Sequence, residues 1–196
     1  MRLRPLIPLP PRGIRWLAIA LACWVVRMSC LAATPEHPGG TNAVAVPAPE
    51  FAAGTWLNLP ASATNAPPSL RGKVTVVHFW TFGCINCRHN LPYYDRWQKN
   101  LGPLGLQIVG IHTPETPGER EPANAMRKVK ELHITYPVLL DPESRNWQQW
   151  QQSVWPAVYL VDKRGRVRFA WEGELEYNGT GGFAKMTRLI RALLAE

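Results

Sequence analysis

The sequence predicts an α/β fold in which a mixed central sheet has helices on both faces. A strand-like run is followed by a helical pattern, and this order is then repeated, which favours parallel strands joined by crossover helices. Two later strand-like runs flank a tight turn, which favours an antiparallel pair. Because both kinds of pairing are expected, the sheet is predicted to be mixed.

The first strand and helix follow an irregular segment that ends near Leu70. Residues 74–80 are β-branched or aromatic apart from one histidine and predict a buried strand. Residues 85–101 predict a helix, which we expect to be kinked at Pro92. The apolar or aromatic positions of this helix are Leu91, Tyr94 and Trp97.

The next strand and helix repeat this order. Residues 106–111 predict a strand, and a helix begins at about Pro122, because proline is tolerated in a first turn. We expect Met126, Val129 and Leu132 to form its buried face, since they recur at helical spacing. Residues 136–140 then predict a short extended segment, and residues 146–152 a short helix.

A hairpin and a helix complete the predicted domain. Residues 157–161 and 167–171 are the two strands, and residues 162–165 are the turn, which ends on Gly165. Residues 183–194 predict an amphipathic helix. The chain is 46% hydrophobic, enough for a core, so wholesale disorder is excluded.

Residues 1–33 have the layout of a secretory signal peptide. They contain five arginines, no acidic residue, an apolar run and a small-residue end. The apolar run is too short to span a bilayer alone, although an uncleaved anchor remains an alternative. A lipoprotein site at Cys30 is disfavoured by Arg27. Without these five arginines the formal charge of +8 falls to about +3, so we expect no nucleic-acid partner.

The N-terminal signal is separated from the domain by residues 34–49, which read as a Pro/Ala-rich linker. We expect the domain itself to cover residues 50–196. Phe51, Trp56 and Leu57 interrupt the polar composition near its start. These three residues predict an extra N-terminal hairpin packed on the domain.

The candidate chemistry lies in a C-x-x-C motif formed by Cys84 and Cys87, between the first strand and the first helix. A thiolate at a helix N-terminus is stabilised by the helix dipole and by free N–H groups. We expect Cys84 to be the attacking thiol at the helix start, and Cys87, one turn deeper, to be the resolving thiol. Signal cleavage would remove Cys23 and Cys30 and leave this pair as the remaining cysteines.

Three other interpretations of the motif stay open. A structural disulfide over so short a loop would restrain little chain entropy. Copper binding by the two thiols is the second, although there is no second paired ligand motif. The third is thiol peroxidase chemistry, since Thr81 and Cys84 have peroxiredoxin T-x-x-C spacing, but Val77 stands where that family has proline.

Several segments in order resemble the TlpA class of thioredoxin-like proteins, and more narrowly the thioredoxin-like domain of DipZ-type proteins. The segments are residues 69–80, Phe79-Trp-Thr-Phe-Gly-Cys-Ile-Asn-Cys87, His112-Thr-Pro-Glu115, Ile134-Thr-Tyr-Pro-Val138, Trp155-Pro-Ala-Val-Tyr-Leu-Val-Asp162 and Gly173-Glu-Leu-Glu-Tyr177. The resemblance covers about residues 69–178. It implies a thioredoxin fold for the domain at residues 50–196, and thiol-disulfide exchange outside the cytoplasm.

The resemblance also implies roles for three residues outside the motif. Pro156 is expected to be a cis-proline facing the cysteine pair, and the backbone of Trp155 to bind an extended substrate segment. A core-packing role is the alternative for Trp155. The family usually has Asp or Asn where this chain has His78, so His78 is either a proton relay for the deeper thiol or a hydrogen-bonded core histidine.

The sequence therefore predicts a periplasmic thiol-disulfide oxidoreductase, acting as a monomer on disulfide-containing exported proteins and needing no metal or other cofactor. Reduction is favoured over oxidation, because Ile85 and Asn86 between the cysteines lack the histidine of strongly oxidising relatives. A reductase of this kind needs a separate membrane electron donor, such as a DsbD/CcdA-type protein. The alternatives are a copper metallochaperone using the same thiols, or a thiol peroxidase.

Overall fold

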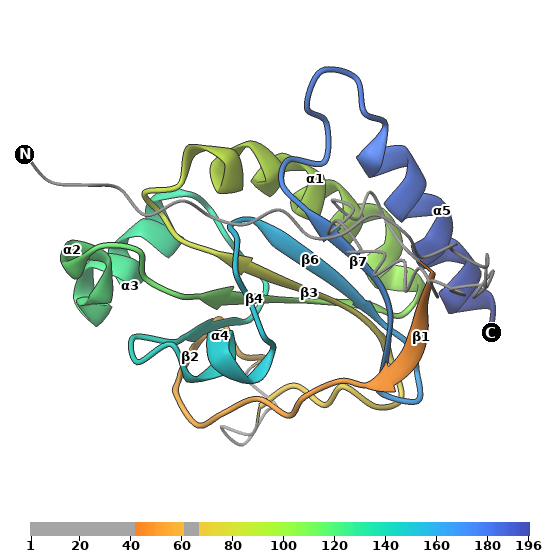
Figure 1. Cartoon of the computed structure of the whole chain (residues 1–196), viewed down its shortest axis with the longest axis horizontal. Coiled ribbons are helices and arrows are strands. Elements are labelled where there is room, and N and C mark those ends of the chain that lie inside the picture. The colour runs from red at the N-terminus through yellow and green to blue at the C-terminus, as the bar shows by residue number, and fades with distance from the viewer. Residues whose placement is uncertain (1–41, 61–66) are drawn as a thin grey trace, which may run out of the picture. The chain divides into compact units, whose positions relative to one another are not determined.

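A seven-stranded mixed sheet organises the residues that the structure, a computed structural model, describes: 42–60 and 67–196 (Figure 1). The strand order is β1-β7-β6-β3-β4-β5-β2. β4 pairs in parallel with β3 and β5, and all other neighbours are antiparallel, which confirms the mixed sheet. The strands are β1 (Asn42–Pro47), β2 (Thr55–Leu57), β3 (Val74–Trp80), β4 (Leu106–His112), β5 (Val138–Leu140), β6 (Ala157–Val161) and β7 (Arg166–Glu172).

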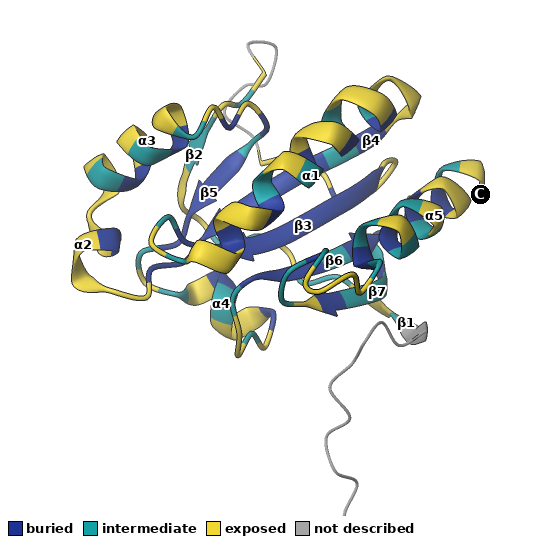
Figure 2. Ribbon diagram, turned by 90° about the horizontal axis from the view of Figure 1, so that it is seen from above, coloured by how far each residue is buried: buried dark blue, intermediate teal, exposed yellow. Residues whose placement is uncertain are grey.

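Helices cover both faces of the sheet, as predicted. α1, α3 and α5 share one buried hydrophobic cluster, and in Figure 2 α1 and α5 lie across the strands with their buried residues turned toward them. The other face is covered by α4 and the segment around Phe51. The helices are α1 (Ile85–Leu101), the 3-10 helix η1 (Gly102–Leu104), α2 (Pro117–Arg120), α3 (Pro122–Glu131), α4 (Arg145–Gln149) and α5 (Gly182–Ala195).

β3 is the central strand, and all seven of its residues are buried. It pairs along its length with β4 on one side and β6 on the other, so neither its faces nor its edges meet solvent. A strand buried on both faces favours the continuous β-branched and aromatic run seen at residues 74–80. Because β3 ends at Trp80 and α1 begins at Ile85, the residues between them are held at one edge of a rigid sheet.

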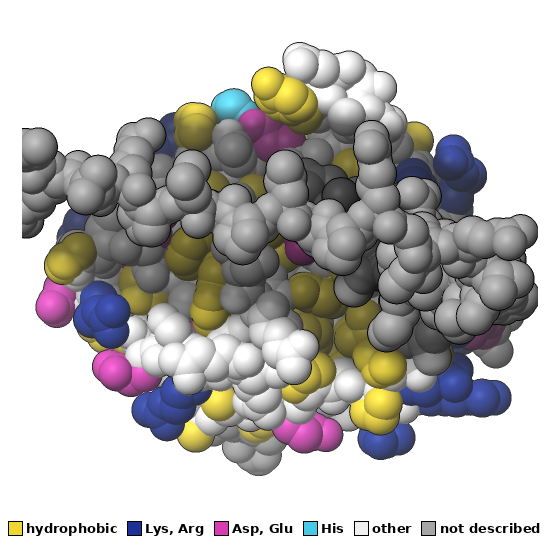
Figure 3. Space-filling view, in the orientation of Figure 1, with side chains coloured by type: hydrophobic (Ala, Val, Ile, Leu, Met, Phe, Trp, Pro, Cys, Tyr) yellow, Lys and Arg dark blue, Asp and Glu magenta, His cyan; other side chains and the backbone are white. Residues whose placement is uncertain are grey.

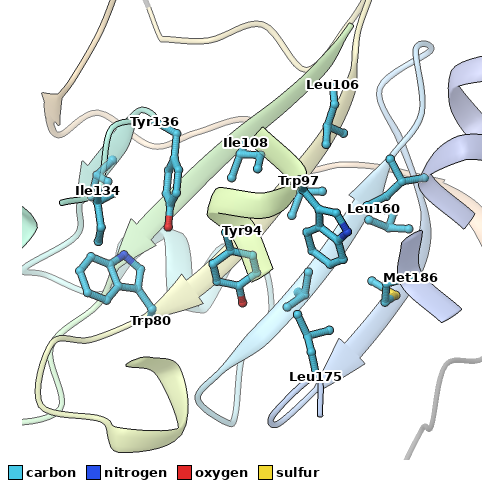
Figure 4. Close-up of a cluster of buried hydrophobic side chains, with 14 of the residues drawn as sticks. Trp80, Tyr94, Trp97, Leu106, Ile108, Ile134, Tyr136, Leu160, Leu175 and Met186 are labelled. Carbon is cyan, nitrogen blue, oxygen red and sulfur yellow. The ribbon is translucent and has the colours of Figure 1, made fainter. Parts of the chain in front are cut away.

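α1 packs on the sheet through large aromatic side chains. Figure 4 shows Tyr94 lying between Trp97 and the pair of Trp80 and Tyr136. Trp97 also stacks on Phe183 of α5, with ring centroids 5.3 Å apart. Its indole N–H donates a hydrogen bond of 2.8 Å to Thr187 Oγ1, so the polar edge of the buried ring has a partner. Pro92 lies inside α1, which continues past it to Leu101.

The predicted N-terminal hairpin is wrong in its pairing. β1 and β2 do not pair with each other: β1 pairs with β7 at one edge of the sheet, and β2 with β5 at the opposite edge. The connection instead lays Phe51 on the α4 face, where its ring lies 5.3 Å from that of Trp56 and 6.3 Å from that of Trp150. Residues 42–47, in the segment predicted as linker, therefore belong to the sheet.

The buried face of α3 agrees with the prediction at Val129 but not at Met126. Ala125 and Val129 are buried, whereas Met126 is 49% exposed and Leu132 is half-buried. The pattern Ala125-x-x-x-Val129 spans one helical turn, so a small alanine was overlooked in favour of the larger methionine beside it. The predicted hairpin of β6 and β7 is confirmed, with Gly165 at a φ of 75°.

The predicted signal peptide at residues 1–33 lies outside the described residues and stays a prediction. Among the described residues, no helix has the length and apolar character needed to cross a membrane. On the face seen in Figure 3, basic side chains are separated by acidic and hydrophobic ones.

Candidate active site

Cys84 and Cys87 form a disulfide at the start of α1, with their Cα atoms 5.3 Å apart. Cys84 is the N-cap residue of the helix, and its Sγ accepts a hydrogen bond of 3.1 Å from the backbone N–H of Cys87. Cys84 is half-buried, whereas Cys87 is fully buried. The accessible sulfur therefore lies at the positive end of the helix dipole, and the inaccessible one lies behind it.

Pro156 lies at the same edge of the sheet as the disulfide. Ala157, which follows it, pairs with Phe79 near the end of β3. The bond between Trp155 and Pro156 is cis, which confirms the geometry implied by the family resemblance. The Trp155 side chain is half-buried and stacks on Trp147, with ring centroids 3.9 Å apart.

Asn90 connects the cysteine helix to the cis-proline loop and was missed in the sequence. Its side-chain oxygen accepts a hydrogen bond of 2.8 Å from Leu175 N, and its amide donates one of 3.1 Å to Gly173 O. Gly173 N in turn donates to Pro156 O at 2.8 Å. One signal was available, because Asn90 follows Cys87 by three residues and therefore shares its helix face.

His78 lies on the α1 face of the sheet in a fully buried aromatic surround. Its ring stacks on Tyr94, with centroids 4.1 Å apart, and meets the ring of Tyr136 edge-on at 5.5 Å. Neither ring nitrogen has a hydrogen-bond partner among the described residues. Burial lowers the pKa of His78 from 6.5 to about 3, which makes its imidazole a poor proton acceptor near neutral pH. The low pKa argues against the proton-relay interpretation. His78 is a buried core residue, but the expected hydrogen bond is not made by any of the described residues.

A second polar cluster lies behind the loop that carries Cys84. The Thr81 hydroxyl and the Phe82 N–H both lie within hydrogen-bond distance of His112 Nε2, at 3.3 and 3.4 Å. Burial lowers the pKa of His112 to about 4, although the nearby charges of Glu119 and Asp141 oppose the shift. Because Thr81 is fully buried and its hydroxyl has both His112 and Glu119 as neighbours, it is not free to bind a peroxide beside Cys84.

Glu119 of α2 completes this cluster and was also missed. Its side chain is buried, and its Oε1 accepts a hydrogen bond of 2.8 Å from the N–H of Gly83, the residue before Cys84. Its Oε2 accepts from the N–H groups of Glu115 and Thr116 at 2.9 and 2.8 Å. The sequence contained the signal for part of this arrangement, since Thr116 and Glu119 have capping-box spacing.

A groove of about 490 Å³ opens beside the cysteine motif. Asn86, from between the two cysteines, lies on one side, and the end of β7 with the segment after it lies on the other. Tyr177 in this groove is 60% exposed, and Ile85 in the motif is 51% exposed. The groove is lined by Asn86, Trp171, Glu172, Gly173, Glu174, Tyr177 and Thr180. Apolar side chains exposed beside a reactive sulfur provide a surface for an extended partner segment.

Over residues 42–60 and 67–196, no group of three His, Cys, Asp or Glu side chains is placed to hold a metal ion.

Comparison with known proteins places the chain in a family. The model of the AhpC/TSA family matches residues 44–170, which is more than half of the chain. The chain belongs to the AhpC/TSA family. The matched range of this AhpC/TSA chain contains the cysteine motif, Glu119 and Pro156, whereas the end of β7 and the segment after it, which line the groove, lie beyond it.

Relatives of this AhpC/TSA chain include the protein DipZ of Mycobacterium bovis, which is 39% identical over 139 residues. That match covers 71% of this chain but only 19% of DipZ, so the chain spans about a fifth of that relative's length. The thiol-disulfide oxidoreductase YkuV of Bacillus subtilis is 25% identical over 128 residues, which are 63% of this chain and 79% of YkuV. The predicted resemblance to DipZ-type proteins is thereby confirmed.

Solved structures support the fold. A thiol-disulfide isomerase from Corynebacterium glutamicum superposes with a TM-score of 0.63 at 22% identity, covering 77% of this chain and 97% of the isomerase. A structure described as a thioredoxin-like protein in the oxidized form gives a TM-score of 0.63 with similar coverage. The predicted thioredoxin fold is therefore confirmed for this AhpC/TSA chain.

Proposed function

We propose that this protein is an exported thiol-disulfide oxidoreductase whose Cys84–Cys87 pair cycles between dithiol and disulfide. The observation that carries the proposal is the asymmetry of the pair. An accessible sulfur caps the helix, a buried sulfur lies behind it, and the two are already within bonding distance. A purely structural disulfide would have no need of an accessible sulfur at a helix N-terminus beside an open groove.

In the reducing direction, the Cys84 thiolate attacks one sulfur of a substrate disulfide. The new mixed disulfide joins Cys84 to the substrate, and the other substrate sulfur leaves as a thiolate that takes a proton from solvent. Cys87, once deprotonated, attacks Cys84 Sγ, so the Cys84–Cys87 disulfide forms and the second substrate sulfur leaves. The substrate gains two electrons and the cysteine pair loses two, which a separate donor must replace.

Substrate binding is assigned to the loop of Trp155 and Pro156 and to the groove next to Asn86. The position of Pro156 just before β6, at the edge where the disulfide lies, supports pairing of the Trp155 backbone with an extended substrate segment. The exposed side chains of Ile85 and Tyr177 offer apolar contacts on the other side of the motif. Such contacts are compatible with protein substrates of varied sequence.

The cellular setting of the proposal rests on the sequence alone. The layout of residues 1–33 supports export to the periplasm, where a monomer would act on exported disulfide-containing proteins. Reduction is favoured because no histidine lies between the cysteines, and a DsbD/CcdA-type membrane protein would then supply electrons. The copper-chaperone alternative uses the same two thiols and is decided by experiment.

The test compares insulin reduction and Cu(I) retention for the full chain. We expect dithiothreitol-dependent insulin reduction by the wild-type protein, none above the uncatalysed rate for Cys84→Ser, and trapped mixed disulfides for Cys87→Ser. Asn124→Ala, a change on α3 outside the site, serves as the control and should retain activity. Retention of Cu(I) by mass spectrometry without insulin turnover would refute the proposal, and an active Cys84→Ser protein would refute the assignment of the attacking thiol.

A further inference from the structure

A buried carboxylate abuts the backbone immediately before the attacking cysteine. Glu119 Oε1 lies 2.8 Å from the N–H of Gly83, and Gly83 is bonded to Cys84. The exposed fraction of Glu119 is 4%, so its charge is removed from solvent. Neither the sequence motif nor the exchange chemistry proposed above uses this group.

The close approach depends on glycine at position 83. A Cβ atom on Gly83 would collide with Glu119 Oε1, and the carboxylate cannot easily retreat because its other oxygen is held by the N–H groups of Glu115 and Thr116. The residue type at position 83 and the carboxylate at position 119 therefore fit each other. This steric match between two separate segments, the motif loop and α2, indicates a built contact.

Glu119 carries a negative charge at neutral pH. Burial by itself would raise the pKa of Glu119, but hydrogen bonds from the Thr81 hydroxyl and from the N–H groups of Thr116, Glu115 and Gly83 outweigh it and hold the pKa below its ordinary value. The imidazole of His112 faces the same cluster and is neutral there, because burial lowers its pKa to about 4. The net field at the motif loop from this side is therefore negative.

Two opposing fields thus act on Cys84. The N-terminus of α1 favours the thiolate, whereas a fixed carboxylate next to Gly83 disfavours it. We propose that Glu119 is a positioning residue of the redox site, which holds the loop before Cys84 in place and limits how far the Cys84 thiol is acidified. This inference rests on the proposed function for its biological meaning, but the effect on the thiol itself does not require a protein substrate.

The consequence concerns the direction of electron flow. Oxidation of the pair releases two protons and two electrons, so an environment that stabilises the Cys84 thiolate stabilises the reduced pair and makes it a stronger oxidant. A carboxylate that opposes the thiolate shifts the equilibrium toward the disulfide. Glu119 would therefore make the pair a better electron donor, which agrees with the reducing direction proposed above.

The test measures the pH midpoint of Cys84 alkylation by iodoacetamide in the reduced full chain, with the Cys84 peptide quantified by mass spectrometry. We expect Glu119→Gln to lower the midpoint by about one pH unit, a tenfold gain in thiolate at pH values below the midpoint. Glu119→Asp retains the charge at a shorter reach and should shift the midpoint less than Gln does. Glu115→Gln removes an exposed carboxylate from the same loop and is the matched control, which should leave the midpoint unchanged.

A purely structural role of Glu119 predicts a different order of the midpoint shifts of the two variants. Asp is too short to reach all three N–H groups, so a midpoint shift for Asp equal to or larger than that for Gln would overturn the inference. An unchanged midpoint for Glu119→Gln would also overturn it, as would an equal shift for Glu115→Gln. If the Glu119→Gln protein does not fold, Glu119→Ala takes its place, since it also removes the charge, and an unchanged midpoint for Glu119→Ala overturns the inference in the same way.

A second readout is the equilibrium of the pair with a glutathione redox buffer, in which Glu119→Gln should be several-fold more reduced than the wild-type protein. Failure of the proposed function can be told apart from failure of this inference. If the wild-type protein does not reduce insulin but the variants show the expected midpoint shifts, the proposed function is refuted and the role of Glu119 stands.

Discussion

Replacing Asn90 by alanine tests whether one buried amide holds the cysteine helix against the cis-proline loop. The side chain is fully buried and makes hydrogen bonds of 2.8 Å to Leu175 N and 3.1 Å to Gly173 O. In the alanine variant both backbone groups lose these partners, and the Leu175 N–H lies where water does not reach easily. Leaving buried polar groups unpaired costs about 1–3 kcal/mol each in unfavourable cases.

We therefore expect Asn90→Ala to lower the free energy of unfolding by about 2–3 kcal/mol. For a domain of this size, each kcal/mol corresponds to about 2–4 °C, so the melting temperature should fall by about 4–12 °C. Because Gly173 N also donates to Pro156 O, the displaced segment should disturb the cis-proline loop, and insulin reduction at permissive temperature should fall roughly tenfold.

Two assays are used, and both start from the oxidised full chain. The first is urea unfolding monitored by circular dichroism, and the second is insulin reduction. Asn124→Ala is the matched control, because its amide hydrogen bond to Gly118 O lies at the surface and its loss should change stability by less than about 0.5 kcal/mol. A loss of less than about 0.5 kcal/mol for Asn90→Ala would refute the reasoning.

The remaining predictions concern acid stability and the face of α3. Burial lowers the pKa of His78 to about 3 and of His112 to about 4. Between these values and about 6.5, the unfolded chain binds protons at both histidines and the folded protein does not. The free energy of unfolding should therefore fall as the pH drops below about 6.5, by up to about 1.4 kcal/mol per pH unit for each histidine. Comparison of urea midpoints at pH 7 and pH 5 should show a smaller decrease for His78→Phe, and an unchanged decrease for the exposed control His133→Asn; a His78→Phe protein as acid-sensitive as wild type would contradict the assignment. On α3, Val129→Ala should cost about 2 kcal/mol in urea unfolding while Met126→Lys costs less than about 0.5 kcal/mol, and a cost for Met126→Lys as large as that for Val129→Ala would show that Met126 belongs to the buried face after all.

Much of the fold could be predicted because the main elements carry strong local patterns. β3 is buried on both faces and therefore needs an unbroken β-branched and aromatic run, which residues 74–80 provide. The turn of β6 and β7 needs a residue that tolerates a positive φ, and Gly165 marks it. The cysteine motif could likewise be placed, since its position after a strand and before a helix follows from the same local patterns.

Strand pairing at the sheet edges could not be predicted in this way. Short segments such as β1 and β2 carry little periodicity, and their partners, β7 and β5, are distant in the sequence. Phe51, Trp56 and Leu57 showed that the segment packs on the domain but not which edge each strand would join. Proximity along the chain suggested a hairpin, whereas the open edges of the larger sheet offered both strands better hydrogen-bond partners.

The sequence was enough to predict the thioredoxin-like domain, the position of Cys84 and Cys87 at a helix start, and the cis bond before Pro156, because these depend on contiguous patterns or on motifs shared with a family. The surroundings of the pair depend on tertiary contacts. The tertiary structure hydrogen-bonds Asn90 of α1 to the segment after β7, isolates His78 among aromatic rings, and brings Glu119 to Gly83. The physical reason is that burial and electrostatic fields arise from side chains that are far apart in the sequence, so no local pattern can specify them.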